Sequence, residues 1–154
     1  MTIEHLTTLN ATDQTLAVMD VAALEVKLLN HRVKSPAHVV LAFMLRPQAD
    51  YAGKTLAGFS PDLEKAREEV RKMYQPRRGE LAVIGYTRPL TESIQLALRI
   101  AREESGPSAK VRTDHFLHAI IDQQDPDVEQ LFDTLGINHW QVQAALKRRT
   151  GVEV

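Results

Sequence analysis

The chain has 154 residues, enough for one domain with a sizeable core, and its 44% hydrophobic and 25% charged residues are typical of a globular protein. A formal net charge of -1 gives no bulk attraction to nucleic acid or anionic membranes, and the absence of cysteine excludes disulfides, thiol nucleophiles and sulfur-ligated zinc. The N-terminus lacks the features of a secretory signal, and the longest apolar run, Val39 to Leu45, is too short to cross a bilayer. We therefore expect a cytoplasmic protein.

Apolar residues at helical spacing predict four helices in the first half of the chain. Their inner faces are expected to be Leu16, Met19, Ala23 and Val26; Val39 to Leu45; Ala52, Thr55, Leu56 and Phe59; and Leu63, Ala66, Val70 and Met73. Ser35-Pro36 starts the second helix, because serine caps free N–H groups and proline needs no donor in the first turn. Ser60-Pro61-Asp62 gives the same signal before the fourth helix.

The triplet Gly53-Lys54-Thr55 resembles the end of a phosphate-binding loop, and the apolar run before it could be the strand that such a loop follows. A phosphate-binding loop also needs glycine five positions earlier, where this chain has Gln48. Thr55 and Leu56 instead belong to the apolar stripe of the third helix. We therefore predict that the triplet is helical and binds no nucleotide.

The second half of the chain repeats the pattern of the first. Residues 75–86, with one proline and two glycines, are the best candidate for a linker. The stripes expected after it are Ile94, Ala97, Leu98 and Ala101; Phe116, Ala119 and Ile120; Val128, Leu131, Phe132 and Leu135; and Val142, Ala145 and Leu146. Gly136 is expected to end the third of these helices, Asn138 to cap the last, and Trp140 to cover the edge of the last.

The two halves correspond position by position. The third-helix stripe of the first half recurs 76 residues later as the stripe that begins at Val128, and His38 recurs 77 residues later as His115. An internal duplication of about four helices per copy explains this register. We predict an all-α fold with repeat one at about 11–74, a linker at about 75–86 and repeat two at about 87–148. The apolar faces of one copy should complete the core of the other.

Both copies carry motifs that resemble the N-terminal Clp R domain of Clp-type AAA+ unfoldases. The motifs are Leu28-Leu29-Asn30-His31 and Ser35 to Phe43 in the first copy, and Tyr86-Thr87, Arg112 to Leu117 and Leu131 to Ile137 in the second. The resemblance covers residues 11 to 148 and implies eight helices in two pseudo-symmetric four-helix halves. No Walker motif or ATPase module accompanies these motifs, so we expect a freestanding Clp R protein.

The resemblance implies paired ligand pockets, because some members of this family bind phosphorylated arginine. Each pocket would use a threonine at the start of the first helix and an acidic residue near the start of the second. Carried over by position, repeat one would use Thr12 and Ala37, and repeat two would use Thr87 and Asp114. Ala37 has no charge, so the first pocket is degenerate, whereas Asp114 can accept the paired N–H donors of a guanidinium. The alternative is that Thr113 and Asp114 only cap a helix.

Other candidates for chemistry are weaker. His115 and His118 could share a helix face beside Asp114, but a third ligand is missing, and His38 and His115 are better explained as structural, hydrogen-bonded histidines. The basic clusters, Arg71-Lys72 with Arg77-Arg78 and Lys147-Arg148-Arg149, lack the aromatic residues that stack on nucleotides. They are better explained as helix ends or as a docking edge for an acidic partner. We expect no catalytic residue, no metal and no cofactor.

These observations predict a non-catalytic protein-binding module. The resemblance implies an accessory or adaptor factor of a Clp unfoldase–protease, whose partners would be Clp ATPase or protease subunits, adaptor proteins or substrate segments, and neither nucleic acid nor membrane. One alternative is the detached N-terminal domain of a longer Clp unfoldase, which would recruit substrates or adaptors. Another is a small hydrolase or metal enzyme on a helical scaffold.

Overall fold

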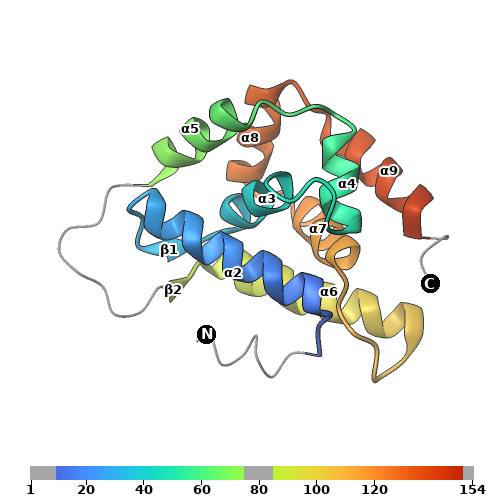
Figure 1. Cartoon of the computed structure of the whole chain (residues 1–154). Coiled ribbons are helices and arrows are strands. Elements are labelled where there is room, and N and C mark those ends of the chain that lie inside the picture. The colour runs from blue at the N-terminus through green and yellow to red at the C-terminus, as the bar shows by residue number, and fades with distance from the viewer. Residues whose placement is uncertain (1–9, 75–84, 151–154) are drawn as a thin grey trace.

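The computed structural model describes residues 10–74 and 85–150 of the chain (Figure 1). This part contains eight α-helices and two short strands, which confirms the predicted all-α fold. In chain order they are α2 (Asp13–Leu28), β1 (Val33–Lys34), α3 (Pro36–Met44), α4 (Tyr51–Ala57), α5 (Leu63–Met73), β2 (Gly85–Tyr86), α6 (Arg88–Ser105), α7 (Thr113–Asp122), α8 (Pro126–Leu135) and α9 (His139–Thr150).

The two repeats exchange their outer helices. In Figure 1, α3 and α7 lie in the middle of the molecule, with α2 and α6 on one side and α4, α5, α8 and α9 on the other. Within the repeats α2 packs on α3 and α6 on α7, but α4 of the first repeat packs on α9, and α8 of the second repeat packs on α5. One hydrophobic cluster contains buried residues of both repeats. The prediction that each copy completes the core of the other is therefore confirmed.

Position in the core explains why the apolar run Val39 to Leu45 does not show a one-sided stripe. Every residue of α3 is buried, because this helix contacts elements of both repeats. A helix that is apolar all round is typical of such a central position. The stripes of α4 and α8 correspond as predicted, since Ala52 and Leu56 are buried in the first repeat and Val128 and Phe132 at the matching positions of the second.

Short strand pairs connect the repeats reciprocally. The predicted linker over 75–86 lies outside the described residues except for its last two, Gly85 and Tyr86, which form β2 and pair in parallel with Val33 and Lys34 of β1. In the reciprocal pair, Ala11 before α2 forms a parallel bridge with Val111 before α7. The segment that precedes the first helix of each repeat is thus bound to the segment that precedes the second helix of the other.

Most helix ends follow the sequence signals, with two exceptions. The first is α7, whose N-cap residue is Arg112, so Thr113 and Asp114 lie inside its first turn and do not cap it. The second is the start of α5. The side chains of Thr12, Asp50, Asp62, Thr87 and Asp125 each accept a hydrogen bond from the backbone N–H three residues later. Ser60, where the cap of the fourth helix was expected, is instead a turn residue with φ of 50°. Gly136 adopts the left-handed conformation, φ 69°, and the Asn138 side chain accepts the N–H groups of the first turn of α9, both as predicted.

Several predicted stripe positions lie closer to solvent than expected. Leu63 is 36% exposed, and Trp140, expected at the edge of the last helix, is 51% exposed. The half-buried stripe residues are Leu16, Ala23, Phe59, Met73, Leu98, Leu135 and Ala145. Leu63 is the first residue of α5 and Trp140 the second of α9, where a side chain extends past the helices that cover the later turns. Ala23 differs for another reason, because α2 carries apolar residues on two faces and the core takes the face that contains Val18 and Ala22.

The Gly53-Lys54-Thr55 triplet lies inside α4, as predicted. The Gly53 N–H donates to the carboxylate of the N-cap residue Asp50 at 2.7 Å, and the Thr55 hydroxyl donates to the Tyr51 carbonyl at 2.7 Å. A Cβ at Gly53 would lie 2.1 Å from the carbonyl oxygen of Arg46. The glycine therefore allows α4 to pack closely against the turn that leaves α3, and the triplet forms no phosphate-binding loop.

Candidate functional site

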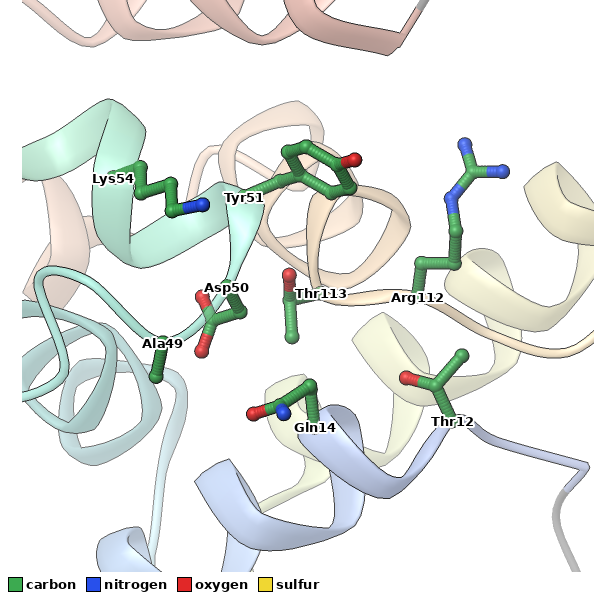
Figure 2. Close-up of a pocket in the computed structure, with 8 residues that line it drawn as sticks. All are labelled: Thr12, Gln14, Ala49, Asp50, Tyr51, Lys54, Arg112 and Thr113. Atoms are coloured by element: carbon green, nitrogen blue, oxygen red, sulfur yellow. The ribbon is translucent and has the colours of Figure 1, made fainter. Parts of the chain in front are cut away.

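A cavity of about 280 Å³ opens where the two repeats meet (Figure 2). It is lined by residues from the start of α2, from the turn before α4 and its first turn, and from the start of α7. The lining residues are Thr12, Gln14, Ala49, Asp50, Tyr51, Lys54, Arg112 and Thr113. Because α2 and α4 belong to the first repeat and α7 to the second, the exchange between repeats creates this cavity.

The carboxylate of Asp50 is the buried acidic group of this cavity. Its side chain is 2% exposed, and its Oδ2 lies 3.5 Å from Arg46 Nε. Burial raises the pKa of Asp50, and the hydrogen bond from Gly53 and the charge of Arg46 oppose that rise. Asp50 therefore serves first to cap α4 and to hold the turn before it.

The exposed cation of the cavity is Lys54. Its ammonium group lies 5.9 Å from the centre of the Tyr51 ring, and Figure 2 shows both side chains at the same edge of the cavity. Thr12, Gln14 and Thr113 add hydroxyl and amide groups. The lining of the cavity therefore combines one exposed ammonium group with neutral hydroxyl and amide groups.

The structure does not bring Thr87 and Asp114 together, because Thr87 caps the start of α6 and Asp114 is joined through Arg112 to Glu104 near the end of α6. The two predicted pocket threonines instead bond to the other repeat. The Thr12 N–H donates to the Val111 carbonyl at 3.0 Å, and the Thr87 N–H donates to the Lys34 carbonyl at 2.9 Å. Each threonine thus lies beside the segment that leads into the second helix of the other repeat. Both threonine side chains cap their own helices through Thr15 and Leu90. Ala37 is fully buried in α3.

Asp114 is bound by an internal guanidinium. Arg112 donates to both carboxylate oxygens of Asp114 at 3.0 Å, and its Nη2 also donates to Glu104 at 2.8 Å. The Asp114 side chain is fully buried, whereas that of Arg112 is 21% exposed. A ligand guanidinium would have to replace Arg112 to reach this carboxylate.

The histidines at the matching positions of the two repeats have the same structural contact. His38 Nδ1 accepts the N–H of Ser35, and His115 Nδ1 accepts the N–H of Arg112, both at 3.0 Å. This contact satisfies a free N–H at the start of α3 and of α7. The prediction of hydrogen-bonded framework histidines is confirmed for both.

A buried histidine pair extends from His38. Because His38 Nδ1 is an acceptor, its Nε2 carries the proton and donates to His31 Nδ1 at 2.8 Å, and His31 Nε2 donates to the Arg71 carbonyl at 3.1 Å. Tyr74 stacks on His38 with the ring centres 5.6 Å apart. Burial, followed by the charges of His31 and Lys34, lowers the pKa of His38 to about 3.

Acidification should therefore weaken the fold. In the unfolded chain His38 takes up a proton near pH 6.5, whereas in the folded chain it stays neutral until about pH 3, so stability falls as the pH drops through this window. We expect the free energy of unfolding to decrease by about 2 kcal/mol between pH 7 and pH 5. Urea unfolding at several pH values checks this. His38→Gln should show a clearly smaller pH slope, and an equal slope in both proteins would contradict the assignment.

The remaining candidates for chemistry are the pair His115 and His118, which line a second cavity of about 130 Å³ with Glu104 and Asp114, and the basic clusters. Among the described residues, no group of three histidine or acidic side chains could hold a metal ion. In the first basic cluster Arg71 pairs with Glu68 and Lys72 with Glu69, which reduces the positive charge of the end of α5, while Arg77-Arg78 lies outside the described residues. No helix in the described part of the chain combines the length and apolarity of a membrane span.

Comparisons with known proteins identify the fold. None of the curated proteins matches the chain significantly. Among solved structures, the N-terminal domain of the caseinolytic protease associated chaperone ClpD from Arabidopsis thaliana matches with a TM-score of 0.75 at 16% identity, over 92% of this chain and 95% of that one. The Hsp104 N-terminal domain from Candida albicans matches with a TM-score of 0.75 at 15% identity, over 94% and 93%.

A third similar structure is a complex of the ClpV N-domain with VipB peptide, with a TM-score of 0.62 at 16% identity, over 90% of this chain and 88% of that one. At these identities the structural matches show a shared fold. The sequence itself adds a direct match, because the profile of the Clp repeat (R) N-terminal domain aligns with residues 10–135. This chain therefore belongs to the family of Clp repeat (R) N-terminal domains.

Proposed function

We propose that this chain is a non-catalytic protein-binding module, acting as an accessory or adaptor factor of a Clp unfoldase–protease in the cytoplasm. Its partners would be Clp ATPase or protease subunits, adaptor proteins or substrate segments. Membership of the family of Clp repeat (R) N-terminal domains supports the assignment to a Clp unfoldase–protease. The complex of the ClpV N-domain with VipB peptide is a precedent for peptide binding by this fold. The observation that carries the proposal for this chain is the cavity at the repeat junction.

The size and charge of the cavity limit what it can bind. A volume of about 280 Å³ is smaller than most drug-sized ligand sites and suits one anchoring side chain of a partner. The exposed ammonium group of Lys54 and the hydroxyl and amide groups at the start of α2 can bind a carboxylate or another anion. We infer that the cavity holds an acidic residue of a partner segment.

Reversing the charge of Lys54 should weaken partner binding. Lys54 is exposed, so Lys54→Glu should change the free energy of unfolding by less than about 0.5 kcal/mol, while recovery of the partner should fall by about tenfold. The matched control is Lys65→Glu, at another exposed lysine, on α5. The measurement is affinity capture from cells of the source organism with the three proteins as bait, quantified by mass spectrometry.

The expected outcome is that Clp ATPase or protease subunits are enriched by the wild-type and Lys65→Glu baits and lost with Lys54→Glu. Absence of Clp subunits from all three captures would contradict the assignment to a Clp machine. Equal recovery with Lys54→Glu would contradict the placement of the binding site in the cavity.

The detached N-terminal domain of a longer unfoldase is the second candidate. One observation favours it: the similar structures from Arabidopsis thaliana and Candida albicans are N-terminal domains, and the alignments cover more than 90% of them and of this chain. An immunoblot of native cells with an antibody against this chain distinguishes the two candidates. A band near 17.3 kDa supports the accessory factor, and a band several times larger supports the detached domain.

A phosphoarginine pocket that contains Asp114 remains a separate proposal, without Thr87. Thr87 caps the start of α6, whereas Arg112 joins Asp114 to Glu104 in the last turn of that helix, about 25 Å along its axis. Since Arg112 binds both oxygens of Asp114, a phosphoarginine ligand has to compete with it. We expect Arg112→Ala to bind a phosphoarginine peptide at least fivefold more tightly than wild type, and Asp114→Asn to lose this binding. Titration by calorimetry measures both. Equal affinity in all three proteins would remove Asp114 from the pocket.

A further inference from the structure

The outer face of α2 carries an apolar stripe that the core does not use. Leu24 and Leu28 are 55% and 67% exposed, the largest exposures among the big apolar residues of the described chain. Ala17 and Val21 precede them by seven residues each and are half-buried. Since residues seven apart lie on the same side of a helix, the four form one stripe along α2. The buried residues of α2, such as Val18, Ala22 and Val26, lie on the other side.

Charged residues follow one flank of this stripe with the same spacing. Asp13, Asp20 and Lys27 are seven residues apart and exposed. The flank is therefore acidic toward the N-terminal end of α2 and basic toward its C-terminal end. Figure 1 shows α2 on the side of the molecule away from α4, α5, α8 and α9.

We propose that this stripe is the contact surface for a second copy of the chain, with the two α2 helices packed antiparallel about a two-fold axis. In such a pair the charged flank of one α2 helix lies beside the charged flank of the other, and the two flanks run in opposite chain directions. Asp20 of each copy then opposes Lys27 of the other, on both sides of the axis. Leu24 lies next to the axis, and Leu28 of each copy packs near Ala17 and Val21 of the other.

The charge pattern favours this arrangement over the alternatives. A parallel pair would turn the charged flank of one helix toward the flank of the other that contains Gln14 and Val21, leaving Asp20 and Lys27 without opposite charges. A partner helix of another protein would need an unrelated charge pattern, whereas this one complements itself. The contact is one helix long, about 24 Å for 16 residues, so we expect a weak dimer with a dissociation constant on the order of 100 µM.

Sedimentation equilibrium of the full chain between 10 µM and 1 mM tests the dimer. Wild type should dimerise, and Lys27→Glu should dimerise at least tenfold more weakly because it places two acidic residues opposite each other. Asp20→Lys alone should also be weakened. A mixture of Lys27→Glu with Asp20→Lys should recover dimers, because each protein then opposes the charges of the other. Thermal melts check that both variants fold, since Asp20 lies close enough to affect the pKa of Lys34.

Disulfide formation gives a second test that changes no charge. The chain has no cysteine, so Leu24→Cys introduces the only thiol, next to the proposed axis. Under mild oxidation it should form a covalent dimer at least tenfold faster than the control Leu63→Cys, an exposed leucine on α5. A chain that stays monomeric at 1 mM would overturn the proposal. A dimer that ignores Lys27→Glu, or that Leu24→Cys links no faster than Leu63→Cys, would do the same, since it would use another face.

Discussion

Gly53→Ala is expected to lower the free energy of unfolding by about 3 kcal/mol or more, although it adds a single methyl group to a helix. In an ordinary helical position the same change stabilises by about 1 kcal/mol. Here the new Cβ would lie 2.1 Å from the backbone oxygen of Arg46, so α4 or the turn before it has to move. That movement also disturbs Asp50, whose carboxylate accepts the Gly53 N–H.

Gly58→Ala is the matched control for this prediction. Gly58 ends the same helix with φ of -62°, and its nearest contact for a Cβ is 3.3 Å, from the Thr55 carbonyl oxygen. We expect a change of less than about 1 kcal/mol there. Urea unfolding of both variants measures the difference. Equal stabilities would show that α4 does not pack against the turn as described, and the cavity lined by that turn would lose its basis.

Phe43→Ala is expected to destabilise both repeats together. Phe43 on α3 and Phe116 on α7 are buried, with ring centres 6.2 Å apart and planes at 87°, so the pair joins the two repeats in the middle of the core. Removing either ring should cost about 3–5 kcal/mol. The double variant should be less destabilised than the sum by about 1 kcal/mol, because each ring is part of the environment of the other.

Two probes decide whether the repeats unfold as one unit. Trp140, the only tryptophan, reports on α9 of the second repeat, and far-UV circular dichroism reports on all helices. Phe43→Ala lies in the first repeat, yet we expect both probes to shift to the same lower urea concentration. Leu28→Ala, at a residue that is 67% exposed, should leave both transitions in place. A Trp140 transition that stays unchanged in Phe43→Ala would show that the repeats fold independently.

Periodicity in the sequence was sufficient to predict the helices and the duplication. The stripes of α4 and α8 lie on single, well-separated faces, so both their burial and their correspondence could be predicted. Prediction was wrong where a helix has two apolar faces or where an apolar residue lies at a helix end. The stripe predicted for α2 was Leu16, Met19, Ala23 and Val26, of which Met19 and Val26 are buried and Leu16 and Ala23 half-buried. Packing against α3 decides that Val18 and Ala22 are buried as well. The prediction that Leu63 is buried was wrong, because Leu63 is the first residue of α5 and its side chain is 36% exposed.

The candidate site could be predicted only in part, because it depends on contacts between repeats. Thr12 was identified from the family resemblance, but its neighbours in the cavity come from α4 and α7. Nothing in a single sequence indicates that Thr12 lies beside Val111, or that Arg112 occupies the carboxylate of Asp114. In the sequence, Lys54 stands out only as part of a triplet that resembles a phosphate-binding loop. Its position at the cavity depends on the helix that the triplet forms.

These features support a consistent account of the molecule. The exchange of helices between repeats builds one shared hydrophobic core, and the same exchange forms the cavity at which we place partner binding. The buried carboxylate of this cavity, Asp50, caps α4 by accepting the Gly53 N–H. Lys54 at the edge of the cavity is exposed, so its ammonium group can contact a partner without a change in the fold.

The most direct test of the proposed function is degradation of a model substrate by the reconstituted Clp unfoldase–protease of the source organism, measured with and without this chain. A saturating amount of the wild-type chain is expected to change the initial rate at least twofold, in either direction, with Lys65→Glu acting in the same way and Lys54→Glu without effect. An initial rate that is the same with and without the wild-type chain would contradict an accessory role.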